Sequence, residues 1–152
     1  AVALLEILVN KQVQQTTQEK QANTSSTSQT LFNLKLLAYE RIILFIERIK
    51  PDSFIPRTLS PSLPYQEYQL LLINEIRKEF EYNLSQQLYL SENAWEVTVN
   101  FKDNIITLIN SAATSCPPQA TASDLARKIL EHYISSDLKG DQILKIVKAE
   151  IQ

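Results

Sequence analysis

Apolar positions between Leu31 and Lys50 recur with the 3.6-residue period of an α-helix. At about 100° per residue, these side chains sweep about half of the helix circumference. They are Leu34, Ala38, Tyr39, Ile42, Ile43, Phe45, Ile46 and Ile49. An apolar arc this wide predicts a central helix covered by several neighbours. Ser28 or Thr30 is expected to cap its start, and Pro51 to end it.

The stretch from Phe54 to Pro64 contains three prolines and is expected to be an extended connection over the core. Ser62 then predicts an N-cap, with Pro64 just inside a helix that runs to about Leu90. The apolar stripe expected to face the core comprises Tyr65, Leu72, Ile73, Ile76, Phe80 and Leu84.

Ser91 predicts the cap of a further helix that continues to Ala113. Its apolar face is Trp95, Val99, Ile106, Ile109 and Ala113, with Phe101, Ile105 and Leu108 adjoining it. Trp95 to Phe101 also alternates as a strand does, so that alternative stays open. We favour helix, because the 3.6-residue pattern continues and no partner strand is visible in the sequence.

The C-terminal third predicts two short helices. Thr121 or Ser123 is expected to cap the first, which turns Leu125, Ile129 and Tyr133 inward. The second is expected to run from Asp141 to Ile151, with Ile143, Val147 and Ile151 on one face. Gly140 is expected either to end a helix in the left-handed conformation or to form the turn before this last helix. The sequence therefore predicts an all-α fold, a small bundle of about five helices plus an N-terminal helical arm.

Residues 1–30 differ in composition from residues 31–152, which we expect to form the helical globular domain. Ala1 to Val9 is apolar except for Glu6, and residues 10–30 are a spacer rich in Gln, Thr and Ser, with a break expected at Thr24 to Ser28. Nine residues are too few to span a bilayer, which needs about 20. Two interpretations stay open: the end of a longer membrane anchor, or an amphipathic helix that docks on the core or on a partner.

The composition argues against several kinds of functional site, because the chain has one glycine, one histidine and one cysteine. Phosphate-cradling loops need several glycines, and most metal sites and nucleophilic triads need more His or Cys. No P-loop, dinucleotide-binding, zinc-finger or hydrolase-elbow motif occurs, nor any Glu-x-x-His pair of a di-iron protein. The net charge of −2 argues against nucleic acid as the main partner. We expect no metal, no cofactor and no enzymatic activity.

Charged residues on the central helix are the remaining candidates for a site. Arg41 and Arg48 border a largely apolar surface, and a buried guanidinium must be paired. The expected partners are Glu40 and Glu47 on the same helix, or Glu75 and Glu79 on the next, in a network that fixes helix register. The alternative is an anion pocket built from Arg41, Arg48 and Arg57. An enzyme is the third hypothesis, and it would require one cleft lined by Tyr39, Glu75, Glu79 and His132.

Two blocks, LLAYERIILFIERIKPDSFIPR (36–57) and NEIRKEFEYNLSQQLYLSENAWE (74–96), resemble a family of uncharacterised proteins from Bacteroidota. The resemblance covers most of residues 31–113 and implies a short transmembrane helix, a polar spacer and a small helical cytoplasmic domain. It thus implies that residues 1–9 end a membrane anchor and that the domain lies at the cytoplasmic face of the inner membrane; without the anchor it would be cytoplasmic. It carries no activity. The shared pattern includes Tyr39, Glu40, Arg41, Glu47, Arg48, Arg57, Asn83, Gln87 and Trp95.

Together these features predict a non-enzymatic, membrane-tethered helical domain that binds protein partners, as an accessory subunit of an envelope complex or as a homo-oligomer. The alternative from another class is a domain that binds a small anionic ligand through its arginine cluster.

Overall fold

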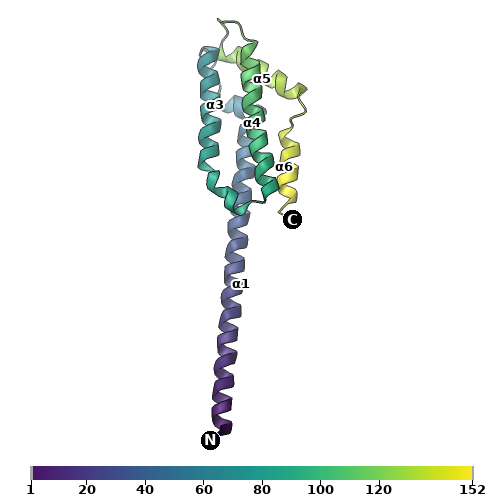
Figure 1. Ribbon diagram of the computed structural model, residues 1–152. Coiled ribbons are helices and arrows are strands. Elements are labelled where there is room, and N and C mark those ends of the chain that lie inside the picture. The colour runs from purple at the N-terminus through teal and green to yellow at the C-terminus, as the bar shows by residue number, and fades with distance from the viewer. Residues whose placement is uncertain (1, 152) are drawn as a thin grey trace. The chain divides into compact units, whose positions relative to one another are not determined.

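The computed structural model describes residues 2–151, the side chains of residues 2 and 22 excepted, and this range contains helices and no strand (Figure 1). The elements are α1 (Val2–Ile49), α2 (Pro51–Thr58), α3 (Tyr65–Tyr82), the 3-10 helix η1 (Leu84–Tyr89), α4 (Glu92–Thr114), α5 (Ala122–Ser135) and α6 (Gly140–Ala149). The predicted all-α fold is confirmed, and Trp95 to Phe101 is helical.

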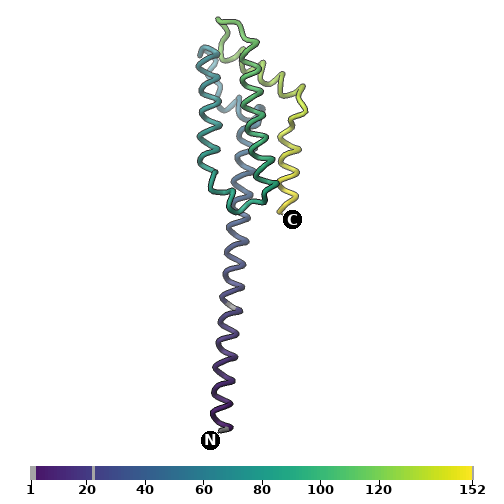
Figure 2. The backbone as a smooth tube through the Cα atoms, in the orientation of Figure 1, coloured from purple at the N-terminus to yellow at the C-terminus, as the bar shows by residue number. Residues whose placement is uncertain are grey.

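The chain divides into two units, Ala1–Leu36 and Leu37–Gln152. The first consists of the N-terminal part of α1, whose backbone is the purple end of the tube in Figure 2. Every side chain described between residues 3 and 36 is exposed, Leu34 included, so the buried face of α1 begins at Ala38 and not at Leu34 as the periodicity predicts.

The break expected at Thr24 to Ser28 is wrong, as is a helix start at Ser28 or Thr30, because α1 is continuous through this segment. Ser and Thr disfavour helices when their hydroxyl groups compete for backbone partners outside the helix. Here the hydroxyl groups of Thr24, Thr27 and Thr30 donate to the carbonyl oxygens four residues earlier, at 2.8–2.9 Å. The competing groups are thereby satisfied inside the helix.

In the second unit, α3, α4 and α5 pack against one another, α6 packs against α4, and α2 packs against α5 (Figures 1 and 2). Large side chains from the C-terminal part of α1 and from α2, α3 and α4 fill the core. The largest fully buried ones are Tyr39, Ile42, Phe45, Ile46, Ile49, Phe54, Tyr68, Leu72, Ile76, Phe101, Ile105 and Ile109. The centre of the buried face of α4 is Phe101, Ile105 and Leu108, which the sequence analysis placed beside that face.

The extended connection expected from Phe54 to Pro64 is wrong in its first half, which is helix α2. Pro51 ends α1 as predicted, but it also begins α2, where a missing N–H costs nothing. Phe54 and Ile55 are 1% and 3% exposed, and their burial stabilises this short helix although Pro56 lies inside it.

The expected cap of α3 at Ser62 and its expected end near Leu90 are also wrong. Pro64 occupies the cap position, and no side chain caps the helix. Instead, the backbone N–H of Tyr65 donates to the carbonyl of Ala120 at 3.1 Å, which ties the start of α3 to the start of α5. The α-helix ends at Tyr82, the chain continues as η1, and Leu84 is exposed rather than buried.

The remaining caps follow the sequence more closely. The Ser91 Oγ accepts from the Ala94 N–H, and Thr121 forms a capping box with Asp124 in which each accepts from the other's backbone N–H. The N–H of Thr121 holds the pKa of Asp124 below its ordinary value. Gly140 is the first residue of α6 and not a left-handed helix end, since no described residue has a positive φ.

In α6, Leu144 and Val147 are buried, whereas Ile143 is only half-buried. Ile151, which was expected in this helix, lies beyond its end at Ala149 and is half-buried. None of the described helices combines the length and the apolar character needed to cross a membrane.

Candidate functional site

An open groove of about 550 Å³ lies between the C-terminal part of α1 and the C-terminal part of α3. Both helices offer residues at the spacing i, i+3, i+4 and i+7, which places four side chains of each on one face. The lining residues are Arg41, Leu44, Phe45, Arg48, Glu75, Lys78, Glu79, Tyr82 and Asn83. Four of the seven charged residues singled out from the sequence, namely Arg41, Arg48, Glu75 and Glu79, therefore share one surface.

Arg48 and Glu79 form an ion pair across this groove. The Nε and Nη2 atoms of Arg48 donate to the Oε1 of Glu79 at 3.1 and 2.8 Å. The Glu79 side chain is 17% exposed and the Arg48 side chain 42% exposed, so the pair is shielded from water on the glutamate side. The hydrogen bond to Glu79 raises the pKa of Arg48 above its ordinary value. The pair joins α1 to α3.

Arg57 of α2 completes this cluster. Its Nη1 lies 3.7 Å from the Glu79 Oε1, and its Nη2 donates to the Arg48 carbonyl at 3.1 Å. Its guanidinium carbon lies 5.3 Å from the centre of the Phe54 ring, a cation–π distance. One carboxylate thus interacts with two arginines from two helices, and three consecutive elements meet at Glu79.

The other charged candidates lie apart from this cluster. Arg41 lines the groove and makes no ion pair with any residue described in the structure, and neither does Glu75. Glu40 is exposed and lies outside the groove. Glu47 pairs with Lys50, which the sequence analysis did not consider.

Lys50 is the first of two interaction centres that sequence reasoning missed. Its side chain is 11% exposed, and its Nζ lies 3.1 Å from the Glu47 Oε2 and 3.0 Å from the Asp141 Oδ1. Burial alone lowers the pKa of Lys50, but the hydrogen bonds to Asp141 and Glu47 outweigh it and the pKa is raised. The i,i+3 spacing of Glu47 and Lys50 was visible in the sequence, whereas the contact with Asp141 spans 91 residues and was not.

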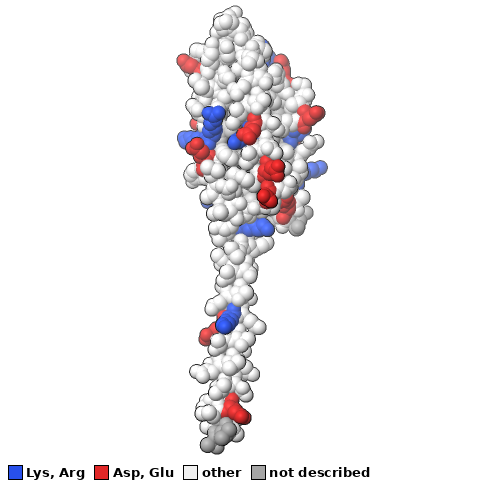
Figure 3. Space-filling view, viewed as in Figure 1, with Lys and Arg blue, Asp and Glu red and all other residues white. Residues whose placement is uncertain are grey.

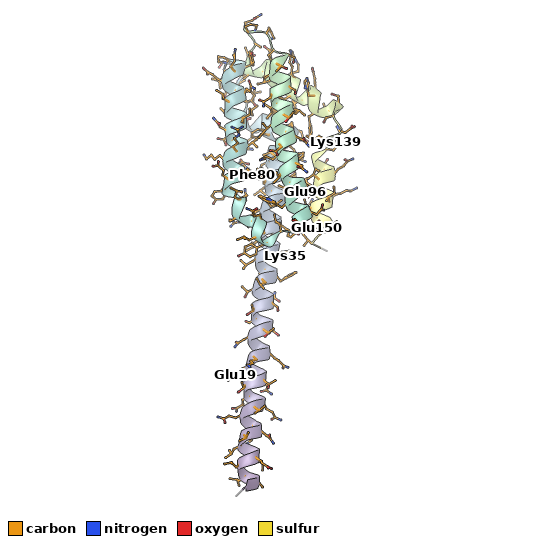
Figure 4. The ribbon with its side chains drawn as sticks, viewed as in Figure 1. Glu19, Lys35, Phe80, Glu96, Lys139 and Glu150 are labelled. Atoms are coloured by element: carbon orange, nitrogen blue, oxygen red, sulfur yellow. The ribbon has the colours of Figure 1, made fainter. Side chains whose placement is uncertain are left out.

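Glu150, at the end of α6, is the second missed centre (Figure 4). Its carboxylate accepts hydrogen bonds from the Ser91 hydroxyl, from the Tyr39 hydroxyl at 3.2 Å and from the Asn93 amide at 2.8 Å. The backbone N–H of Ser91 in turn donates to the Tyr39 Oη at 3.2 Å. This network fastens α6 to α1 and to the start of α4, where a carboxylate also complements the helix dipole.

The positions of the acidic, histidine and cysteine side chains decide which metal-binding or catalytic sites they can form. The described residues hold no group of three or more His, Cys, Asp or Glu side chains that could bind a metal ion. Of the four residues that an enzyme would require in one cleft, Glu75 and Glu79 line the groove, whereas Tyr39 and His132 do not. Burial raises the pKa of the Cys116 thiol, and a low thiolate fraction makes a cysteine a poor nucleophile.

Comparison with known proteins shows to which family the chain belongs. A model of a family of unknown function, DUF7935, matches residues 1–152. The chain belongs to DUF7935. No curated protein and no solved structure matches it. The expected membership in a family of uncharacterised proteins is thereby confirmed. The function of DUF7935 is unknown, so the function of this chain has to be inferred from its own residues.

Proposed function

We propose that this chain is a non-enzymatic, membrane-tethered helical protein whose N-terminal helix docks onto a protein partner. The observation that carries the proposal is the exposure of large apolar side chains along residues 3–36 of α1. The most exposed of them are Leu4, Leu5, Ile7, Leu8, Val9, Val13, Leu31 and Phe32, each 53–69% exposed. Water disfavours such a surface by about 25 cal/mol per Å², so a binding partner that covers it is strongly favoured.

The helix propensity of the middle of this segment supports the need for a partner. Residues 23–28 read NTSSTS, and each of these residue types costs about 0.5 kcal/mol relative to alanine in a helix, or about 3 kcal/mol together. A single helix that buries nothing is marginal in water even with good helix formers. A helix through this segment is therefore expected to depend on contacts made outside its own chain.

The membrane tether is assigned to residues 1–9. Leu4, Leu5, Ile7 and Leu8 lie within about 160° of the helix circumference, and Glu6, the one charged residue among these nine, lies on the opposite side. A helix with one broad apolar face favours the boundary between water and an apolar phase. The proposal is that these residues enter the lipid surface and that the partner-binding part of α1 follows directly.

Flotation with phosphatidylcholine vesicles tests the tether. These lipids carry no net charge, so electrostatic attraction is absent and insertion of apolar side chains drives binding. We expect the wild-type chain to float with the vesicles and a variant carrying Leu5→Lys and Leu8→Lys to stay in the dense fraction. A control carrying Gln14→Lys and Gln18→Lys has the same net charge and is expected to float. A wild-type chain that does not float would contradict the tether.

Binding of a small anionic ligand in the groove is the second candidate. Arg41 favours it, because this exposed guanidinium lines the groove without an ion pair to any described residue. However, Glu75 and Glu79 line the same groove and oppose an anion, and Glu79 already neutralises Arg48. We therefore rank this function second.

A further inference from the structure

The chain exposes more surface than a protein of its mass needs to. Its accessible surface is 9820 Å², whereas a folded monomeric protein of 17.4 kDa exposes roughly 7,800 Å². The difference of about 2,000 Å² is well above the ~800 Å² that each partner buries in a standard interface. The side chains described between residues 3 and 36 are all exposed, so α1 offers the area that a stable dimer needs.

A seam runs along this part of α1 with alternating spacings of four and three residues, as in a coiled coil. We call it the α1 seam, and it comprises Val9, Val13, Thr16, Lys20, Asn23, Thr27, Thr30 and Leu34. Six of its eight members are Val, Thr or Leu. The opposite face of the same segment is polar as far as Gln29, with Lys11, Gln15, Gln18, Ser25 and Gln29, and the apolar Phe32 follows on that face about one turn later. One side of the helix is thus suited to contact another helix.

Charged residues are sparse in residues 3–36 of α1, and the surface of this segment is mostly white in Figure 3. In a heptad with Val13, Lys20, Thr27 and Leu34 at the a positions, Val9, Thr16, Asn23 and Thr30 take the d positions. β-branched residues at the a position favour two strands when leucine fills the d positions, and here three of the four d residues are β-branched as well, so branching alone does not set the number of strands. A single polar residue at an a position specifies the oligomeric state and the register, and Lys20 is the one charged residue among the a positions.

We propose that the partner of the α1 seam is a second copy of this chain, in a parallel and in-register two-stranded coiled coil. The proposal rests on the docking role proposed above, because a shared tether at residues 1–9 places both N-termini at one lipid surface. In this arrangement each seam residue lies opposite its own copy, so the branched residues pack on one another.

Charge complementarity supports the parallel arrangement. Lys20 occupies an a position, and Glu19 directly precedes it at the flanking g position, where Figure 4 shows its side chain leaving α1. In a parallel pair the g residue of one helix lies beside the a residue of the other, so Glu19 of each copy neutralises Lys20 of its partner copy. In an antiparallel pair that keeps the seam in contact, a positions face d positions, so Lys20 would meet Asn23 and not Glu19. In the parallel pair Asn23 lies opposite its own copy, and its side-chain amide offers that copy both a donor and an acceptor.

Cysteine cross-linking tests the proposal, because the chain has a single cysteine that is easily removed. In a Cys116→Ser background, Thr27→Cys places a thiol on the seam and Ser25→Cys places one on the opposite face. The a positions of a parallel pair lie within disulfide distance, whereas residues on the outer faces do not. With copper phenanthroline as oxidant, we expect Thr27→Cys to give a covalent dimer and Ser25→Cys to remain largely monomeric.

Sedimentation equilibrium supplies an independent measure, with an expected mass of twice 17.4 kDa for the wild-type chain at high concentration and a return to monomer for Leu34→Glu. A monomer at every concentration, or equal cross-linking of both cysteine variants, would overturn the dimer. A dimer whose Thr27→Cys variant does not cross-link would overturn the parallel register. If the chain floats with vesicles yet stays monomeric, the self-association fails while the membrane-tethered role stands; if it dimerises but does not float, the tether fails instead.

Discussion

Replacing Gly140, the single glycine, with alanine is expected to lower the free energy of unfolding by about 1–3 kcal/mol. A Cβ at this position would lie 2.4 Å from the Cδ and 2.5 Å from the Cγ of Lys50, and 3.1 Å from the Tyr133 Oη. The Lys50 stem cannot move aside freely, because its Nζ is held by Glu47 and Asp141. Thermal or urea unfolding measures the loss.

A double-mutant cycle identifies the cause of this loss. In a Lys50→Ala background the obstructing side chain is gone, so Gly140→Ala is expected to cost much less than in the wild-type chain. An equal cost in both backgrounds would mean that Lys50 does not make Gly140 necessary. Helix propensity alone predicts the opposite sign, because alanine is the better helix former.

The second large effect is expected at Glu79, where Glu79→Gln should lower the free energy of unfolding by about 1–2 kcal/mol. This value lies between the small contribution of exposed ion pairs and the large cost of breaking buried ones, as the 17% exposure of the Glu79 side chain indicates. The substitution keeps the side-chain volume but leaves Arg48 and Arg57 without their shared carboxylate.

Glu75→Gln is the matched control for Glu79. Glu75 lies one turn earlier on the same face of α3 and makes no ion pair with a described residue, so its change is expected to stay within about 0.5 kcal/mol. Urea unfolding of both variants at low and high salt measures the difference, which should shrink with salt. Equal losses for the two variants would contradict the assigned role of Glu79.

The sequence predicts the helices of the second unit well where a repeating apolar pattern coincides with a recognised cap. Ser91 and Thr121 are examples, because the hydroxyl group and the helix it caps lie within a few residues of each other. The start of α3 was mispredicted because its stabilising contact is a backbone hydrogen bond to Ala120, 55 residues away in the chain. Local signals cannot reveal such a partner.

Contacts between residues far apart in the chain also explain why the pairing of the charged residues could not be predicted. Arg48 was a candidate because it borders an apolar surface, and Glu79 because it is an acid on a following helix, yet their pairing depends on how α1 packs on α3. Tyr39 and Glu150 are 111 residues apart, and nothing in the local sequence of Glu150 distinguishes it from a solvated carboxylate. For residues 23–28 the local composition itself gave a wrong prediction, because it indicates a break whereas α1 is continuous there.

The central claim is that the helix through residues 10–30 is stabilised by contacts outside its own chain. Amide hydrogen exchange, followed by mass spectrometry on the full chain, tests this most directly. In dilute solution without vesicles we predict fast exchange for residues 10–30 and slow exchange for residues 42–49, whose apolar side chains are buried or half-buried except at Leu44. At high concentration on vesicles, residues 10–30 should become protected. Equal protection of residues 10–30 in the dilute monomer would contradict the account.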